Sequence, residues 1–209
     1  VVSDVDSANV TVTLTLSDVA SGSLNTDTAG LITSTFAGGV WTASGAIADV
    51  NSLLAGVTFT PALNYNSNFS IATSVDDGVA AAITGTKVMT GTPVNDPQTA
   101  TNLSAAETYV EDVALNLTNI VVSDVDSANV TVTLTLSDIT AGSLSTATSN
   151  AVTSTYIPGT GVWTASGAIA DVNSLLAGVT FTPALNYNSN FSIATSVDDG
   201  VAAAITGTK

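Results

Sequence analysis

An internal repeat is the feature that most constrains the fold of this chain. Residues 1–18 (VVSDVDSANVTVTLTLSD) recur without change at 121–138, and residues 39–87 recur at 161–209. A repeat of about 120 residues is too long for one turn of a solenoid, and it matches the size of one independently folded domain. The sequence therefore predicts two domains of the same architecture.

The expected domain boundaries follow from where the repeat begins and ends. We expect a first domain over residues 1–94 and a second over residues 95–209. The segment 98–120 opens the second copy and has no counterpart before Val1, which predicts that the first domain lacks its N-terminal strand or strands. The second domain is expected to lack the end of its last strand. Either the chain is a fragment of a longer array, or strand donation from adjacent chains completes both sheets.

Within each copy, apolar residues alternate with polar ones. Val130, Val132, Leu134 and Leu136 alternate with threonines, a pattern typical of a half-buried antiparallel strand with one apolar face. Residues 10–17 are the twin of this strand. Gly, Asn, Asp and Pro separate the other expected strands. These strands are Ala114–Ser123, Val162–Ala165, Val179–Pro183, Phe191–Val197 and Ala202–Lys209.

One stretch departs from the strand pattern. Ile169, Val172, Leu175 and Leu176 fall at helical spacing, and Gly178 provides a stop, so we expect a short helix over residues 169–177. The second copy also gains two residues around Ile157-Pro158-Gly159, which predicts a loop or hairpin end there. Seven or so short strands and one helix in each copy predict an all-β fold built from β-sandwiches.

Composition excludes several classes of function. The chain has 17 acidic and two basic residues, a net charge of -15 and neither histidine nor cysteine. This charge disfavours nucleic acid and anionic membranes as partners. Imidazole bases, thiolate nucleophiles, disulfides and ordinary zinc sites are excluded, and no apolar stretch is long enough for insertion into a membrane. We therefore expect no enzyme.

The acidic residues gather at strand ends and in the segment between the copies. Clustered carboxylates repel one another unless a cation or open solvent separates them. Oxygen ligands without histidine or cysteine favour Ca2+. The alternative is that Asp and Asn stand there only because they favour turns. The acidic motifs are 4–6 (DVD), 76–78 (DDG), 93–97 (PVNDP), 107, 111–112, 124–126 (DVD) and 198–200 (DDG).

The order of these motifs resembles a known family. Glu111-Asp112, DVD at 124–126 and DDG at 198–200, with PVNDP between the copies, resemble the cadherin-like tandem repeats of giant RTX-type bacterial surface adhesins. The resemblance covers the whole chain. It implies tandem Ig/cadherin-like Greek-key β-sandwiches with one short helix per repeat, and calcium ions shared at each junction between neighbouring repeats.

The resemblance also implies which residues bind calcium. In the first copy the equivalent positions would face a linker outside this chain. Asn64-Tyr65-Asn66 stands where the family has an acidic pair, which lowers the expected affinity. At the junction between the copies the ligands would be Asn95, Asp96, Asp124, Asp126 and Asp198, with Asn129 and Asp199 as weaker candidates, and in the first copy they would be Asp4, Asp6 and Asp76.

These inferences predict a calcium-rigidified stalk of an extracellular bacterial adhesin. The near-identity of the copies favours a spacer over a specialised ligand-binding domain. Two alternatives stay open. One is an adhesive module that binds carbohydrate or protein through the loops near Trp163 or through the threonine face of residues 10–17. The other is an extracellular filament subunit that exchanges strands with its neighbours.

Overall fold

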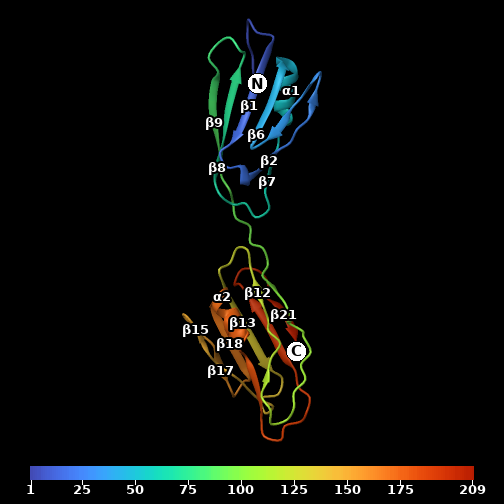
Figure 1. Cartoon of the computed structure of the whole chain (residues 1–209), viewed down its shortest axis with the longest axis vertical. Helices are drawn as coiled ribbons and strands as arrows, with labels where there is room; N and C mark the ends of the chain where they lie inside the picture. Colours follow the sequence, from blue (N-terminus) through green and yellow to red (C-terminus); the bar gives the residue numbers. More distant parts are fainter. The chain divides into compact units, whose positions relative to one another are not determined.

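The chain folds as two compact units, which we call unit 1 (Val1–Val94) and unit 2 (Asn95–Lys209). The structure is a computed structural model that describes all residues from 1 to 209. Figure 1 labels the helices and strands of both units. No helix in either unit has the length and apolar character needed to cross a membrane.

Unit 1 is built on a five-stranded antiparallel sheet with β1 at its centre. The hairpin of β5 and β6 pairs with one side of β1, and the hairpin of β8 and β9 pairs with the other side. In spatial order the strands are β5 (Thr35–Ala37), β6 (Val40–Ala46), β1 (Asn9–Leu16), β8 (Phe69–Asp76) and β9 (Ile83–Met89).

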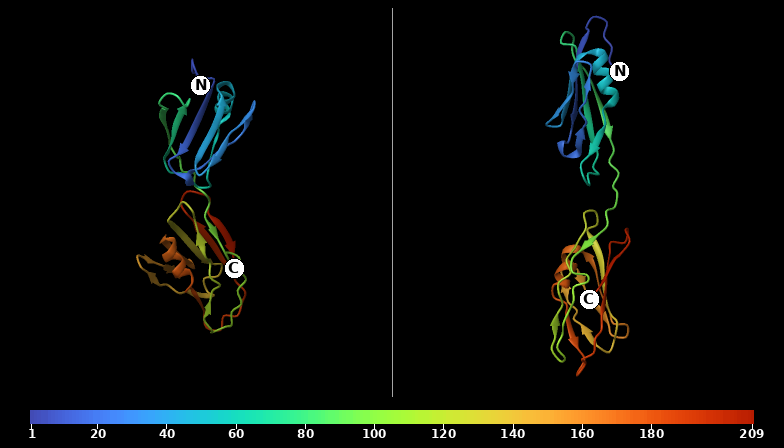
Figure 2. Two further views of the ribbon diagram at one scale, coloured as in Figure 1. Left: turned by 45° about the horizontal axis from the view of Figure 1, so that its top comes forward. Right: turned by 90° about the vertical axis from the view of Figure 1, so that its right-hand side faces the viewer.

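A second layer covers one face of this sheet. The helix α1 (Ile47–Gly56) packs against β1 and β6, and Figure 2 shows it lying on the sheet from two further sides. Apolar residues of both layers, with Trp41 among the most buried, form one core. The layer also contains η1 (Val19–Ser21), the pair β2 (Gly22–Leu24) and β7 (Phe59–Pro61), and the hairpin β3 (Thr28–Ala29) and β4 (Ile32–Thr33).

Unit 2 repeats this plan strand by strand. Its large sheet contains β17 (Thr155–Ile157), β18 (Val162–Ala168), β13 (Asn129–Leu136), β20 (Ile193–Asp198) and β21 (Ile205–Thr208) in that order. Its second layer contains α2 (Ile169–Leu176), β14 (Gly142–Leu144), β19 (Thr180–Pro183), and the hairpin β15 (Thr148–Ser149) and β16 (Val152–Thr153).

The segment that opens the second copy adds two short strands to unit 2, β10 (Thr99–Ala100) and β11 (Leu115–Asn116), and one of them pairs with a strand at the start of the repeated stretch. β10 pairs with β12 (Val122–Ser123), and β11 pairs with β19. As a result, the smaller sheet has three strands in unit 2, in the order β11-β19-β14, whereas in unit 1 it has only β2 and β7.

Several expectations from the sequence are confirmed. The fold is all-β, and the apolar residues of β13 are all buried while its threonines lie on the other face. The helix lies over Ile169–Leu176, close to the expected bounds. The two inserted residues fall in the turn between β17 and β18, where the chain reverses direction and its length does not affect the core.

One expectation was wrong. Residues 114–123 do not form one strand, because this stretch leaves the sheet of β19 after Asn116 and joins β10 only at Val122. Trp163 is fully buried, and its indole N–H donates to the carbonyl of Ser145 at 2.9 Å. A side chain without exposed surface cannot stack on a sugar ring, so Trp163 packs in the core, and the adhesive alternative would have to use the neighbouring loops or the threonine face.

Candidate metal centre

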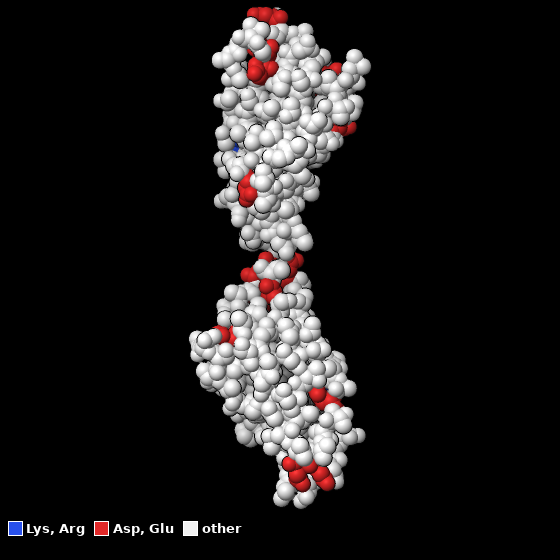
Figure 3. Space-filling view, viewed as in Figure 1, with Lys and Arg blue, Asp and Glu red and all other residues white.

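The candidate site lies at one end of unit 2, where two Asp-containing turns meet the residues that connect the units. We call it the acidic end. Figure 3 shows acidic side chains gathered at the end of unit 2 where the chain enters it. The acidic end consists of Asn95, Asp96, Asp124, Asp126, Asp198 and Asp199.

The first turn precedes β13 and is organised by Asp124. Its Oδ1 accepts hydrogen bonds from the backbone N–H groups of Asp126 (2.8 Å) and Ser127 (2.7 Å), as in an Asx-turn. The other oxygen, Oδ2, is buried and has no hydrogen-bond donor. A buried carboxylate oxygen without a partner is costly, so Asp124 is the residue of this turn that most needs a cation.

The second turn begins at Asp198, the last residue of β20, and also contains Asp199. Asp198 Oδ1 accepts only from the N–H of Gly200 in its own turn, at 2.8 Å. Asp199 Oδ1 accepts from the N–H groups of Val201 (3.0 Å) and Ala202 (2.9 Å). The N–H of Val201 contributes most to lowering the pKa of Asp199 below its usual value, against an opposing effect of burial, so this carboxylate stays charged at neutral pH.

The connecting residues are bound to both turns. The side-chain amide of Asn95 donates to Asp199 Oδ2 at 3.1 Å, and the backbone N–H of Asp96 donates to Asp126 Oδ2 at 2.6 Å. The Ser127 hydroxyl also reaches Asp199 Oδ2, at 3.5 Å. The structure thus brings Asn95 and Asp96 to the carboxylates that the sequence predicted as ligands.

The carboxylates do not, however, form a closed cage. No group of three or more acidic side chains is arranged as a set of metal ligands in the structure. The Asp198 side chain accepts a hydrogen bond from Gly200 and none from the connecting residues, and Asn129 begins β13 opposite Ala168. Sequence reasoning ranked Asp199 below Asp198, whereas Asp199 is the residue that binds Asn95.

Gln98 is a polar residue of this region that the sequence analysis missed. It is 2 % exposed, and its side-chain amide donates to the carbonyls of Val197 (2.8 Å) and Ala203 (3.2 Å). Its Oε1 has no donor. Because Thr99 pairs with Ser123, continuing this antiparallel register by one residue places Gln98 opposite Asp124. The only sequence signal was a long amide directly after the connecting segment.

Unit 1 forms the same two turns without a connecting segment. Asp4 Oδ1 accepts from the N–H groups of Asp6 and Ser7, both at 2.8 Å, and Asp76 Oδ1 accepts from Gly78 at 2.7 Å. Ser7 links the turns through its hydroxyl, which donates to Asp77 at 3.1 Å. The hydrogen bonds of these turns are therefore local, and both units form them.

Comparisons with known proteins do not identify a family. No family model and no curated protein matches the chain. Among solved structures, the C-terminal domain of the AgI/II polypeptide BspA from Streptococcus agalactiae covers 96% of this chain and 83% of its own, with 9% identity and a TM-score of 0.30. The C-terminal domain of the antigen I/II-family protein AspA from Streptococcus pyogenes covers 97% and 85%, with 9% identity and a TM-score of 0.26. Likenesses this weak carry no argument about family or function.

Proposed function

We propose that this chain is a pair of non-catalytic spacer repeats from the stalk of an extracellular bacterial adhesin. In this proposal Ca2+ binds at the acidic end of unit 2 and fixes the connecting residues to that unit. The observation that carries the proposal is the buried oxygen of Asp124 without a partner, at an end of the unit that already holds Asn95 and Asp96.

The residues of the acidic end fit calcium chemically. Ca2+ takes about six to eight oxygen ligands in flexible geometry. Asp124 Oδ2 and Gln98 Oε1 are buried oxygens without donors, and Asp126, Asp198 and Asp199 add carboxylates on the adjoining turns. Water would complete the coordination. A bound cation would also offset the repulsion among these carboxylates in a chain of net charge -15.

The structure of the connecting segment explains what an ion would change. No helix or strand is formed between the end of β9 at Met89 and the start of β10 at Thr99. Asn95 and Asp96 make hydrogen bonds to the acidic end, and Gln98, at the end of this segment, donates to two backbone carbonyls of unit 2. Ion binding there would leave fewer residues free to bend. In the full protein, neighbouring repeats of the same kind would be the partners at each junction.

The first test is a calcium titration of the 209-residue chain followed by thermal unfolding. A ligand that binds only the folded state raises the melting temperature with its concentration, and a Kd of about 10⁻⁴–10⁻³ M is typical of extracellular modules. Asp124→Asn keeps an oxygen for the turn but removes the negative charge, so it should abolish the shift. The matched change Asp4→Asn should leave the shift unchanged. A melting temperature that is the same in EGTA and in calcium would contradict the proposal.

The second test measures the connecting segment itself. Spin labels on one exposed position of each unit report the distribution of distances between the units. Calcium is expected to narrow this distribution, and Asp124→Asn to prevent the narrowing. Calcium binding with an unchanged distribution would retain the metal site but refute its role in stiffening the stalk.

A further inference from the structure

Unit 1 exposes a face that unit 2 covers, although the residues of the two faces are identical. Phe181 is 1 % exposed, whereas its counterpart Phe59 is only partly buried. Ile205 packs against the core of unit 2, whereas its counterpart Ile83 is 76 % exposed. Since the copies share their sequence here, the difference arises from residues 98–120 of unit 2, which we call the opening segment.

Gln98 is the first residue of the opening segment that binds this face. In unit 2 it donates to the carbonyls of Val197 and Ala203. The equivalent carbonyls in unit 1 belong to Val75 and Ala81, and both residues line a hollow of about 320 Å3. The hollow is therefore placed to receive a buried glutamine. Other residues that line it include Val2, Asp4, Asp77 and Ile83.

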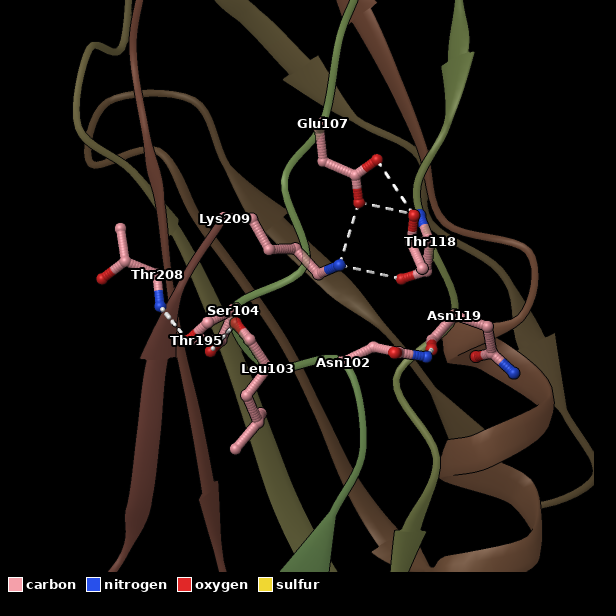
Figure 4. Close-up of polar contacts among 9 residues, drawn as sticks. All are labelled: Asn102, Leu103, Ser104, Glu107, Thr118, Asn119, Thr195, Thr208 and Lys209. Atoms are coloured by element: carbon pink, nitrogen blue, oxygen red, sulfur yellow. Dashed lines mark hydrogen bonds and ion pairs between the residues drawn. The ribbon is translucent and has the colours of Figure 1, made fainter.

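Leu103 provides the second contact, which Figure 4 shows in unit 2. Its carbonyl accepts a hydrogen bond from the Thr195 hydroxyl at 3.0 Å. The backbone of Leu103 lies so close to Gly207 that a Cβ there would come within 2.6 Å of the Leu103 carbonyl oxygen. The counterparts of Thr195 and Gly207 in unit 1 are Thr73 and Gly85. A Cβ on Gly85 would meet only the Thr73 hydroxyl, at 3.0 Å.

A buried ion pair provides the third contact (Figure 4). Lys209 Nζ lies 2.9 Å from Glu107 Oε1 and 3.0 Å from the carbonyl of Thr118, and the lysine side chain is 1 % exposed. The chain has only two basic residues. The other is Lys87, which is the counterpart of Lys209, is exposed and makes no ion pair. Unit 1 thus exposes Lys87 at the position where, in unit 2, Lys209 is paired with Glu107.

An aromatic cluster provides the fourth contact. In unit 2 the ring of Tyr109 packs edge-on against Phe181 and Phe191, with centroids 5.6 Å apart in both cases. Phe59 and Phe69, the counterparts in unit 1, lie 4.8 Å apart and keep nearly the same geometry as the 4.7 Å pair of unit 2. This pair therefore forms without the tyrosine, with Phe69 in the core and Phe59 partly exposed.

We infer that this face of unit 1 is a docking site for a copy of the opening segment, a polypeptide with the chemistry of residues 98–120. Such a segment supplies a glutamine for the hollow, a backbone carbonyl for Thr73, an aromatic ring for Phe59 and a glutamate for Lys87. The inference does not depend on calcium binding, because the opening segment makes these contacts through protein groups alone.

The test uses a chain extended at its N-terminus by a copy of residues 95–120, joined directly to Val1 as Ile120 is joined to Val121. Because the natural chain has no cysteine, Ile83→Cys provides a single thiol on the exposed face. We expect the extension to slow labelling of this thiol by a factor of five or more, on the order expected for a face that opens only rarely. An unchanged labelling rate would overturn the inference.

Two variants control for the contacts. Gly85→Val is expected to leave labelling of the unextended chain unchanged, because its Cβ meets only a hydroxyl, and to restore fast labelling in the extended chain by blocking the approach of the segment. Lys87→Gln, a substitution at an exposed position, should restore part of the fast labelling in the extended chain. Protection that survives Gly85→Val would refute docking in the geometry of unit 2. Slow labelling of a dimeric unextended chain would show that a second copy covers the face instead, and would also overturn the inference.

Discussion

Asn95 donates its side-chain amide to Asp199 at 3.1 Å, which joins the first residue of unit 2 to a turn 104 positions later in the chain. The carboxylate is held in place by two backbone N–H groups of its own turn. The carboxylate can therefore accept the hydrogen bond from the Asn95 amide without rearrangement. The fold thus fixes the start of the unit to the same end that carries the Asp124 turn.

This contact predicts different effects for two equivalent substitutions. Asp199→Asn should loosen residues 95–97, because the hydrogen bond from Asn95 loses its charged acceptor, and the measurement is amide exchange of the connecting segment by NMR. The matched change Asp77→Asn in unit 1 has no such partner and should leave these amides unchanged. Equal exchange in both variants would show that Asn95 is held by other contacts.

The buried tryptophan predicts a stability effect without an effect on ligand binding. Trp163→Ala should lower the free energy of unfolding of unit 2 by about 3–5 kcal/mol, as for other large core residues, and should leave the Ser145 carbonyl without its donor. Trp163→Phe should lower the free energy of unfolding by a smaller amount. Urea unfolding measures both. Loss of binding to a glycan without loss of stability would contradict this assignment.

Replacing Gln98 is expected to lower the free energy of unfolding by more than the change in side-chain volume would. Gln98→Leu keeps most of the side-chain volume but leaves the carbonyls of Val197 and Ala203 without this donor. Unpaired buried polar groups cost about 1–3 kcal/mol. Urea unfolding should show a loss of this order, and a variant as stable as the natural chain would mean that these carbonyls find other donors.

The Asp138 carboxylate predicts how stability depends on acid pH. It accepts hydrogen bonds from the hydroxyl and N–H of Thr140, at 2.6 and 2.8 Å, and from the hydroxyl of Tyr187 at 2.9 Å. These contacts, with the Thr140 hydroxyl first, hold the pKa of Asp138 below its ordinary value of 3.8. Because the pKa is lower in the folded state, the stability gained is fully present above pH 3.8 and is lost as pH falls through the folded pKa.

Two substitutions test this pH dependence. Thr140→Ala, which introduces the residue that unit 1 has at Ala20, should raise the pKa of Asp138 more than Tyr187→Phe does. NMR titration of the Asp138 carboxyl carbon measures both shifts. Unfolding curves of Thr140→Ala should also depend less steeply on pH in the acid range. An Asp138 pKa that neither substitution moves would show that other groups set it.

Local patterns in the sequence predicted much of the fold. The alternation of Val130, Val132, Leu134 and Leu136 indicated β13, and the helical spacing after Ala168 indicated α2. These predictions succeed because side-chain periodicity along a strand or helix is a local property. The Asp-containing turns are local as well, which is why unit 1 and unit 2 form them alike.

The burial of identical residues was decided by tertiary structure alone. Phe59 and Phe181 have the same sequence neighbours, and only the opening segment, which packs on one unit, makes their exposure differ. The break between Asn116 and Val122 has a similar origin, since pairing with two different sheets divides a stretch that alternates like one strand.

The contacts of the acidic end also depended on the fold. The sequence by itself determined which oxygens are available there and that each Asp stands in a turn. It could not rank Asp199 above Asp198, nor find that Gln98 is buried beside them, because hydrogen bonds between residues about a hundred positions apart exist only after the sheets have formed. The periodicity of a strand determines which of its faces is apolar and will be buried. Which segment of the chain covers that face depends on tertiary packing.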